Sequence, residues 1–258
     1  MIIRSIYHIQ PAGSDFLVQT DYTVYASGRV AASMSFINQS GASRTLSNIE
    51  YAFTNVEDSL VWNVSTINSG NGIGFLRTSG TTPLPNLLLV NYSADTTTDT
   101  DGTGNRYWYV TNQILAANAA FSRQWEMQLG PGGQTTTTLA TRTTDARTPG
   151  LTVVSGGTAG AYSTAQAAYT LQASGASVSF YPTAAQQRHT PIFVINNWLN
   201  PTWQVSLNGV VQASSTSPQT SQAVVSYDAA NQRLIIQYLG TIPTTATTAQ
   251  RTFVVSSN

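Results

Sequence analysis

The feature that most constrains the fold of this chain is a two-residue turn, Asn208-Gly209, between two stretches of alternating apolar residues. A type I′ hairpin needs positive φ at both central residues, and Asn-Gly accepts that geometry with little strain. The turn is therefore expected to join residues 203–207 and 210–212 as antiparallel strands. Further apolar stretches at 191–197 and 223–239 flank it, so this C-terminal block predicts an antiparallel β structure.

The same alternation begins near the N-terminus. Phe16, Val18 and Tyr22 fall on one face of an expected strand, and the pattern resumes over residues 30–36 after a turn at Gly28. Strict alternation places one face of a strand in the core and the other in water. Roughly fifteen short strands, separated by turn signals, can be identified in this way. The sequence thus predicts an all-β fold, a large antiparallel β-sandwich of the super-sandwich type with minimal helix.

Two segments carry more specific expectations. Residues 114–121 contain an alanine-rich stretch, which makes them the best helix candidate in the first half of the chain, at about two turns. The threonine-rich residues 135–144 predict an exposed strand, because β-branched side chains favour extended backbone. Composition changes little along the chain, so we expect a single β-sandwich domain over residues 1–258. A separate C-terminal hairpin lobe over 190–258 is the alternative.

The low charge of the chain excludes several kinds of partner. Charged residues make up 9%, the net charge is zero and every cation is arginine. Without a basic patch the chain lacks the field that attracts nucleic acid, and no apolar run is long enough for a membrane span. An uncharged polar surface favours an extracellular or cell-surface location, with a virion as the alternative.

The N-terminus and the lack of cysteine add further limits. Residues 1–9 have no basic region followed by a long apolar stretch, so they do not read as a signal peptide. Either a signal was removed earlier or the protein does not use that route. Cysteine is absent, which excludes disulfides, thiolate metal sites and thiol nucleophiles.

Four segments together resemble the large β-sandwich domains of the galactose-mutarotase-like superfamily, which occur in polysaccharide lyases and as accessory domains of glycosidases. The segments are residues 22–30, 125–130, 190–198 and 234–240. The resemblance implies a sandwich fold and contact with polysaccharide. Its motifs are strand and turn signatures, so no active-site residue carries over from that family.

Aromatic residues are the first candidates for binding. Sugars pack their CH faces on aromatic rings, while neighbouring amides bond their hydroxyl groups. Tyr107, Tyr109 and Trp198, with the amide of Asn197, are therefore predicted to bind carbohydrate. Core packing is the alternative for each ring, and it is favoured for Trp203, which is in phase with the apolar residues that follow it.

The acidic loop at residues 95–105 is the candidate metal site. Asp99, Asp101 and Asn105 supply oxygen ligands around a glycine, which suits calcium. The pattern departs from an EF-hand because the glycine is not at the sixth position and no glutamate closes the loop. A solvated acidic turn is the alternative.

Catalytic residues are few. The only histidines are His8 and His189, and a lyase could use His189 with the adjacent Arg188 and a tyrosine, although lone histidines are more often structural. Glu126 lies between Trp125 and Met127 in an alternating stretch, so its side chain is expected to point away from theirs.

Three functions follow. The first is a non-catalytic, surface-exposed β-sandwich that binds carbohydrate or forms a surface assembly. The second is a polysaccharide lyase or another polysaccharide-degrading enzyme. The third is a structural subunit of a filament or virion that self-associates through edge strands, whose unpaired backbone groups can bond a neighbour.

Overall fold

The computed structural model describes residues 1–10, 15–47, 49–54, 62–67, 71–77, 86–93, 95, 98–99, 106–110, 112–130, 134–183 and 187–257. The chain divides into two compact units. Unit 1 is Met1–Thr143 with Thr164–Gln166, and unit 2 is Thr144–Ser163 with Ala167–Asn258. The single β-sandwich domain predicted over residues 1–258, with a C-terminal hairpin lobe over 190–258 as the alternative, stays a prediction. Each unit is described by itself.

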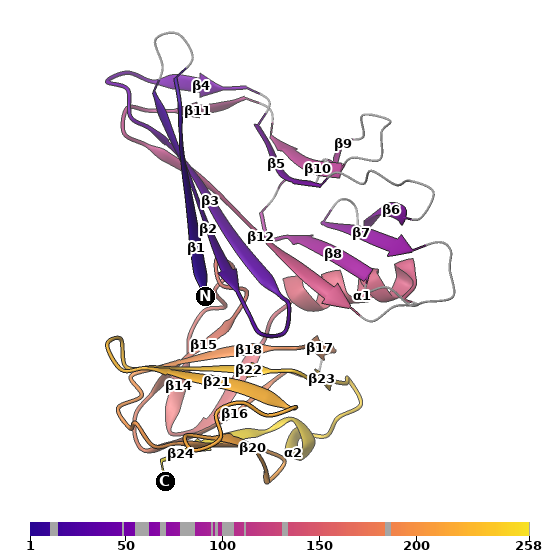
Figure 1. The fold of residues 1–258 in the computed structure, drawn as a ribbon, viewed down its shortest axis with the longest axis vertical. Coiled ribbons are helices and arrows are strands. Elements are labelled where there is room, and N and C mark those ends of the chain that lie inside the picture. The colour runs from indigo at the N-terminus through magenta and orange to yellow at the C-terminus, as the bar shows by residue number, and fades with distance from the viewer. Residues whose placement is uncertain are drawn as a thin grey trace. The chain divides into compact units, whose positions relative to one another are not determined.

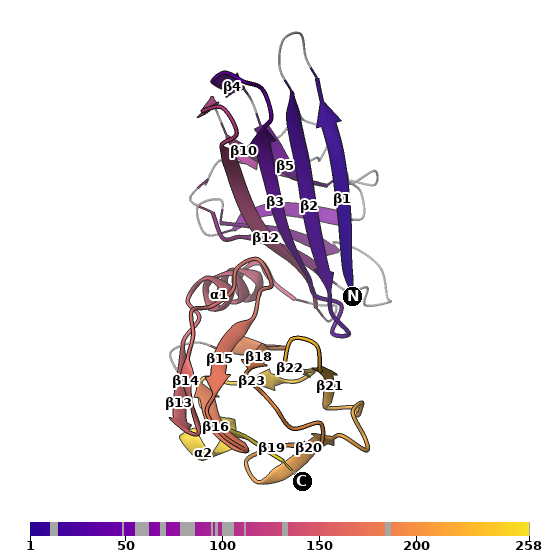
Figure 2. The same cartoon turned by 90° about the vertical axis from the view of Figure 1, so that its left-hand side faces the viewer.

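Unit 1 is built on a seven-stranded antiparallel sheet with the order β1-β2-β3-β12-β8-β7-β6. Figure 2 shows its long strands β1, β2, β3 and β12 side by side. The strands of this sheet are β1 (Ile2–Ile9), β2 (Phe16–Val24), β3 (Val30–Asn38), β12 (Ala120–Gly130), β8 (Asn86–Asn91), β7 (Gly72–Arg77) and β6 (Trp62–Ile67). The pairing of β2 with β3 confirms the predicted N-terminal hairpin, and Gly28 in its turn has a φ of 79°.

Two smaller sheets complete unit 1 (Figure 1). Their strands are β5 (Ile49–Thr54), β10 (Arg106–Val110) and β9 (Thr98–Asp99) in one, and β4 (Arg44–Leu46) and β11 (Gln113–Leu115) in the other. Tyr51 and Trp108 from the three-stranded sheet share a buried cluster with Phe16, Val18 and Trp125 of the large sheet. The three-stranded sheet therefore packs on part of one face of the seven-stranded sheet.

Helix α1 (Thr136–Arg147) replaces the strand predicted over residues 135–144, so that prediction was wrong. Thr135 begins the helix, since its hydroxyl accepts the backbone N–H of Thr138 at 3.2 Å. Leu139 is fully buried and Arg142 nearly so. Burial of this helix face outweighs the weak strand preference of threonine, as tertiary contacts often do.

The helix predicted over residues 114–121 is also absent. Strand β11 ends at Leu115 and β12 begins at Ala120, with a turn between them. Asn118 in this turn has a φ of 60°, a left-handed conformation that does not continue a helix. Leu115 and Phe121 instead supply apolar side chains to the core of unit 1.

Unit 2 consists of two five-stranded sheets and a buried core shared by both. The first sheet, in spatial order, is β13 (Leu151–Ser155), β16 (Ser177–Pro182), β24 (Phe253–Ser256), β19 (Gln204–Leu207) and β20 (Val210–Ser214). The second is β14 (Gly157–Ala159), β15 (Tyr169–Ala173), β18 (Ile192–Asn196), β22 (Arg233–Tyr238) and β21 (Ala223–Asp228). The short pair β17 (Arg188–His189) and β23 (Thr241–Ile242) and helix α2 (Thr248–Arg251) complete the unit.

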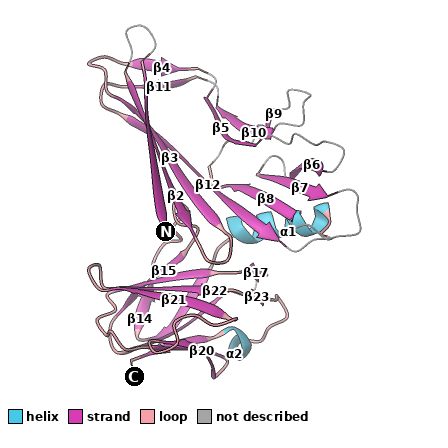
Figure 3. Cartoon of the chain, viewed as in Figure 1, coloured by secondary structure: helices cyan, strands magenta, loops and turns pink. Residues whose placement is uncertain are grey.

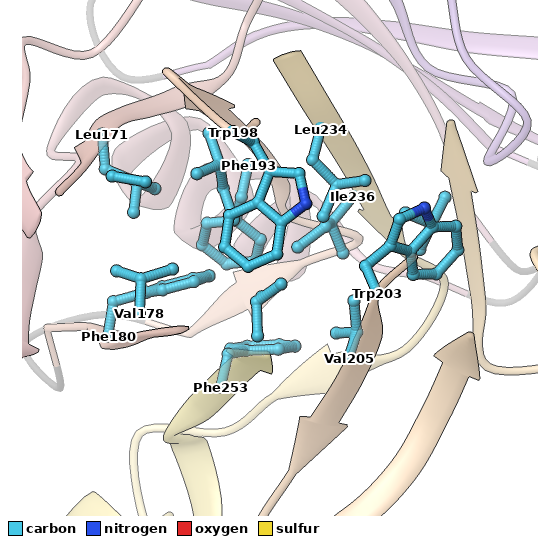
Figure 4. Close-up of a cluster of buried hydrophobic side chains, with 14 of the residues drawn as sticks. Leu171, Val178, Phe180, Phe193, Trp198, Trp203, Val205, Leu234, Ile236 and Phe253 are labelled. Atoms are coloured by element: carbon cyan, nitrogen blue, oxygen red, sulfur yellow. The ribbon is translucent and has the colours of Figure 1, made fainter. Parts of the chain in front are cut away.

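The core of unit 2 is rich in aromatic rings (Figure 4). Phe193 lies 5.0 Å from Phe180 and 4.9 Å from Phe253 between ring centroids, which joins the two sheets. Trp203 is buried with Val205, as its phase predicted. The hairpin that follows is also confirmed, since Asn208-Gly209 has φ values of 52° and 75°.

These observations confirm an all-β fold with mostly antiparallel sheets (Figure 3), in which β15 and β18 form a parallel pair. The described residues form 24 strands and two helices, more strands than the sequence suggested because several are only two or three residues long. Within the same residues, neither helix has the length and hydrophobicity of a membrane span.

Candidate functional site

One face of the seven-stranded sheet carries a hollow of about 420 Å³. Strands β2, β3, β12 and β8 supply its floor, and β5 of the small sheet contributes Glu50 and Tyr51. Trp125 and Tyr51 are largely buried, whereas Tyr22 is half-buried and Glu50 is exposed. The hollow therefore has an aromatic floor and a rim that water reaches.

The strand register explains why aromatic rings meet here. Tyr22 pairs with Ala32, and Ala32 pairs with Trp125 on the next strand, so the three residues form one row across the sheet. The methyl group of Ala32 leaves room above it. The rings of Tyr22 and Trp125 meet edge to face across this gap, with centroids 6.5 Å apart and planes at 87°.

Tyr51 completes the aromatic group from the opposite side of the hollow. Its ring centroid is 5.6 Å from that of Trp125 and 5.9 Å from that of Trp108. These separations are typical of favourable aromatic pairs. The three rings that line the hollow are thus positioned by packing as well as by the register of the sheet.

A polar cluster fixes the hydroxyl group of Tyr51. This hydroxyl donates to Asp95 Oδ2 at 2.9 Å and accepts from Asn91 Nδ2 at 3.1 Å. Arg123 forms an ion pair with Asp95, including a bond from Nη2 to Oδ1 at 2.8 Å. The guanidinium of Arg123 is therefore occupied by a carboxylate of the protein, and the Tyr51 hydroxyl has a structural role.

Burial affects the acidity of the two tyrosines of the hollow. Burial raises the pKa of Tyr22, and the nearby Tyr7 raises it further. Burial, followed by the charge of Asp95, raises the pKa of Tyr51 well above its usual range. Both phenols are therefore harder to ionise than a free tyrosine, and the rings face the hollow uncharged at neutral pH.

The opposite face of β12 is chemically different. The carboxylate of Glu126 is fully buried and lies 3.3 Å from Nε of Arg29. Gln128 donates to Glu126 and accepts from Arg142 of α1. Glu126 thus points away from Trp125, as predicted, and lies in a buried cluster with Arg29, Gln128 and Arg142.

The predicted carbohydrate-binding residues do not form one platform. Trp198 is fully buried in the core of unit 2 (Figure 4), so its predicted role in binding is wrong. The loop after β18 turns at Asn197, whose φ is 60°, and directs the indole inward while Asn197 stays exposed. Tyr109 is half-buried in unit 1 and pairs with Glu50 on β5. The side chain of Tyr107 lies outside the described ones.

The predicted calcium site also falls largely outside the described residues. Asp99 belongs to β9, but its side chain is not described, and Asp101 and Asn105 are not described at all. The calcium site stays a prediction. Elsewhere, the described residues contain no group of three acidic or histidine side chains that could hold a metal ion.

Arg188 and His189, considered for lyase chemistry, have structural contacts in unit 2. Arg188 is buried and donates to the backbone oxygens of Asp145 at 2.5 Å and Thr148 at 2.9 Å. His189 Nδ1 lies 3.2 Å from the hydroxyl of Thr241. The guanidinium of Arg188 therefore ties two chain segments together and is not presented to a ligand.

Unit 2 carries a second depression, of about 680 Å³, near α2. Tyr238 is the one aromatic ring among its described lining residues, and amides such as Gln212 and Gln250 supply most of its polar groups. It lacks the group of rings found in unit 1, so the hollow on the seven-stranded sheet is the stronger candidate site.

Sequence reasoning did not identify Tyr22, Tyr51, Trp125 and Glu50 as site residues. The alternation correctly placed Tyr22 and Trp125 on inward faces. An inward face is usually core, however, and a local pattern does not reveal where the covering layer stops. The signal that could have found the site is the small Ala32, which lies between Tyr22 and Trp125 across three neighbouring strands. This signal can be read only once the strand register is known from the structure.

The sequence matches no family model and no curated protein. Among solved structures, a chain described as a kojibiose phosphorylase from the human microbiome is similar with a TM-score of 0.45 and 11% identity, over 57% of this chain and 21% of that one. A polysaccharide lyase is similar with a TM-score of 0.40 and 11% identity, over 93% of this chain and 31% of that one. The chain spans less than a third of either protein, and similarities of this size establish neither family nor activity.

Proposed function

We propose that unit 1 binds a neutral carbohydrate chain in the hollow of its seven-stranded sheet. One observation carries this proposal: Tyr22, Tyr51 and Trp125 line a single hollow together with the carboxylate of Glu50. Its volume of about 420 Å³ lies within the range of roughly 300–1,000 Å³ that is usual for small-ligand sites.

The chemistry of the lining suits a sugar. Aromatic rings pack against the CH faces of a pyranose, and the carboxylate of Glu50 can accept hydrogen bonds from its hydroxyl groups. Thr20, which also lines the hollow, adds a hydroxyl that both donates and accepts. Rings and hydrogen-bonding groups therefore occur on the same surface.

The charge of the hollow favours a neutral ligand over an acidic one. Glu50 is the charged residue among the described lining residues, and the nearby Arg123 is paired with Asp95. A uronic acid would bring a second carboxylate to a site whose described lining residues include Glu50 and no cation. This argument supports binding over the lyase alternative.

Hydrolysis is also less well supported than binding. Glycoside hydrolysis generally uses two carboxyl groups on either side of the scissile bond, and the described lining of the hollow contains Glu50 alone. We assign the protein a binding role at an exposed location, on a cell surface or a virion, because its few charges suit such a surface.

The test begins with an array of neutral oligosaccharides and continues with calorimetric titration of the one bound best. We expect Tyr22→Ala to weaken binding by about tenfold, since the ring contributes on the order of 1.4 kcal/mol. Glu50→Gln should weaken it less. Tyr227→Ala, a half-buried tyrosine of unit 2, is the matched control and should bind normally.

Two outcomes would contradict the proposal: no neutral glycan binds, or both hollow variants bind like the unmodified chain. Release of an ultraviolet-absorbing unsaturated product from a uronic-acid polymer would instead establish the lyase alternative.

A further inference from the structure

Strand β1 is an unusually exposed edge strand. It lies at the end of the seven-stranded sheet and pairs with β2 alone among the described residues. Ile2, Ile6 and Tyr7 are 65%, 53% and 62% exposed. Long apolar edge strands of this kind readily pair with another strand, and proteins usually protect them with charge or cover. β1 therefore has both an open edge and apolar side chains in water.

The charges on β1 give little protection. Arg4 is held by Asp21 through two bonds of 2.6 and 2.8 Å. His8 lies 3.5 Å from a carboxylate oxygen of Asp15. Arg4 is thus paired with an acidic group of its own chain and His8 lies close to one, so the edge carries no row of unpaired charges, although two cations placed directly opposite each other would still repel.

The backbone of β1 presents every second residue to the open edge. The N–H of Val24 donates to the oxygen of Met1 at 2.8 Å, which identifies these two residues as a hydrogen-bonded pair. Such pairs alternate in antiparallel strands. Odd-numbered residues of β1 therefore bond β2, while Ile2, Arg4, Ile6 and His8 direct their backbone groups outward.

We propose that this edge pairs with β1 of a second copy of the chain, antiparallel and centred on Ser5. A two-fold axis perpendicular to the sheet keeps each face on its own side, so opposed residues must share a face. In the register centred on Ser5, Ile3 faces Tyr7 and Arg4 faces Ile6. The outward backbone groups then bond one another, and apolar side chains pack in cross-strand pairs.

Electrostatics selects this register over its neighbours. Centring the pair on Arg4 would place two guanidinium groups directly opposite each other. Centring it on Ile6 would place Arg4 opposite His8, whose ring carries the same sign of charge when protonated. Like charges directly opposite are unfavourable in a sheet, and the register centred on Ser5 contains no such pair.

The pairing joins two seven-stranded sheets into one continuous sheet. Tyr7 and Ile3 share the face of Val18 and Tyr22, with which they pair, so the hollows of both copies lie on the same side. This last point rests on the proposed function: a dimer would offer two sugar sites to one surface and bind it with avidity. The pairing itself does not depend on sugar binding.

The test measures the mass of the full chain in solution by light scattering after size-exclusion chromatography, without sugar. We expect a dimer. Ile6→Lys places a new ammonium opposite Arg4 at both symmetric positions and should give a monomer. Ile114→Lys is the matched control, since Ile114 is 68% exposed on β11, and it should stay dimeric. Circular dichroism checks that each variant is folded.

A cross-linking experiment tests the register. The chain has no cysteine, so Ser5→Cys introduces a single thiol that meets its symmetry mate across a non-hydrogen-bonded pair, at about 4.5 Å between Cα atoms. That separation permits a disulfide. Ile3→Cys, which faces Tyr7, should not cross-link. A monomeric unmodified chain, a dimeric Ile6→Lys variant, or Ile3→Cys cross-linking in place of Ser5→Cys would overturn the proposal.

Discussion

The two units apply the same alternation of inward and outward residues but use their aromatic rings differently. In unit 2, Phe180, Phe193 and Phe253 are fully buried in a core shared by two sheets. In unit 1, Tyr22 is half-buried and shares a hollow with Trp125. An inward row becomes core where a second sheet covers it completely, and becomes a candidate site where the cover is a short sheet.

The units also differ in how they hold charge. Unit 1 buries the Arg29–Glu126 pair beneath its sheet, with side chains 8% and 0% exposed. In unit 2, the Arg233–Asp228 pair lies at the surface, with side chains about 30% exposed. A buried pair stabilises a fold only while both partners remain, whereas a surface pair contributes little.

The largest effect should come from the filled interior of unit 2. Trp198→Ala leaves a large cavity among packed side chains, and we expect it to lower the free energy of unfolding by about 4 kcal/mol. Urea unfolding, followed by amide exchange of unit 2 peptides, measures this loss. Leu199→Ala, at a 64% exposed neighbour, should change stability by less than about 0.5 kcal/mol. Similar small losses for both variants would show that the interior of unit 2 tolerates voids.

The next effect concerns the buried pair of unit 1. Arg29→Met leaves the Glu126 carboxylate without its ionic partner, and we expect a loss of about 3 kcal/mol. The double variant Arg29→Met/Glu126→Gln removes the isolated charge and should recover more than half of that loss. Amide exchange of β12 peptides reports both. Equal losses in the single and double variants would assign the effect to packing.

A smaller effect is expected at the hollow in alkaline solution. The folded-state pKa of Tyr51 is raised, mainly by burial, so its contribution is complete below the unfolded pKa of about 10 and is lost as pH rises above it. Tyr51→Phe should cost about 1 kcal/mol at neutral pH through its lost hydrogen bonds. The variant should lose less stability than the unmodified chain between pH 9 and pH 11. Parallel stability curves over this interval would contradict a buried phenol at this position.

The smallest effect is expected at the surface of unit 2. The hydrogen bond from Arg233, followed by that from Asn231, lowers the pKa of Asp228 to about 2. The stabilisation is present above the unfolded pKa of about 3.9 and is lost as pH falls towards 2. Asp228→Asn should slightly flatten the acid side of the stability curve of unit 2. A steeper loss of stability at low pH in the variant than in the unmodified chain would contradict this prediction.

The backbone geometry of single turns could be predicted from the sequence. Which strand faces and rings a second layer covers could not. The hairpin turn predicted at Asn208-Gly209 was correct because the geometry of a type I′ turn depends on its own two central residues. The strand predicted over 135–144 was wrong because burial of Leu139, a tertiary effect, decides that segment. Trp198 was misassigned because its loop turns the ring inward. The hollow was missed because Tyr22 and Trp125 meet through a third strand, which no window of sequence contains.

The position of β24 has a consequence for biosynthesis. This strand, Phe253–Ser256, lies between β16 and β19 in the middle of its sheet. A nascent chain that has not yet released residues 253–256 from the ribosome leaves β16 and β19 without their shared neighbour, and exposes the inner faces of both sheets. Unit 2 therefore completes its folding after translation has passed this strand, and until then its aromatic interior lacks the cover that β24 supplies.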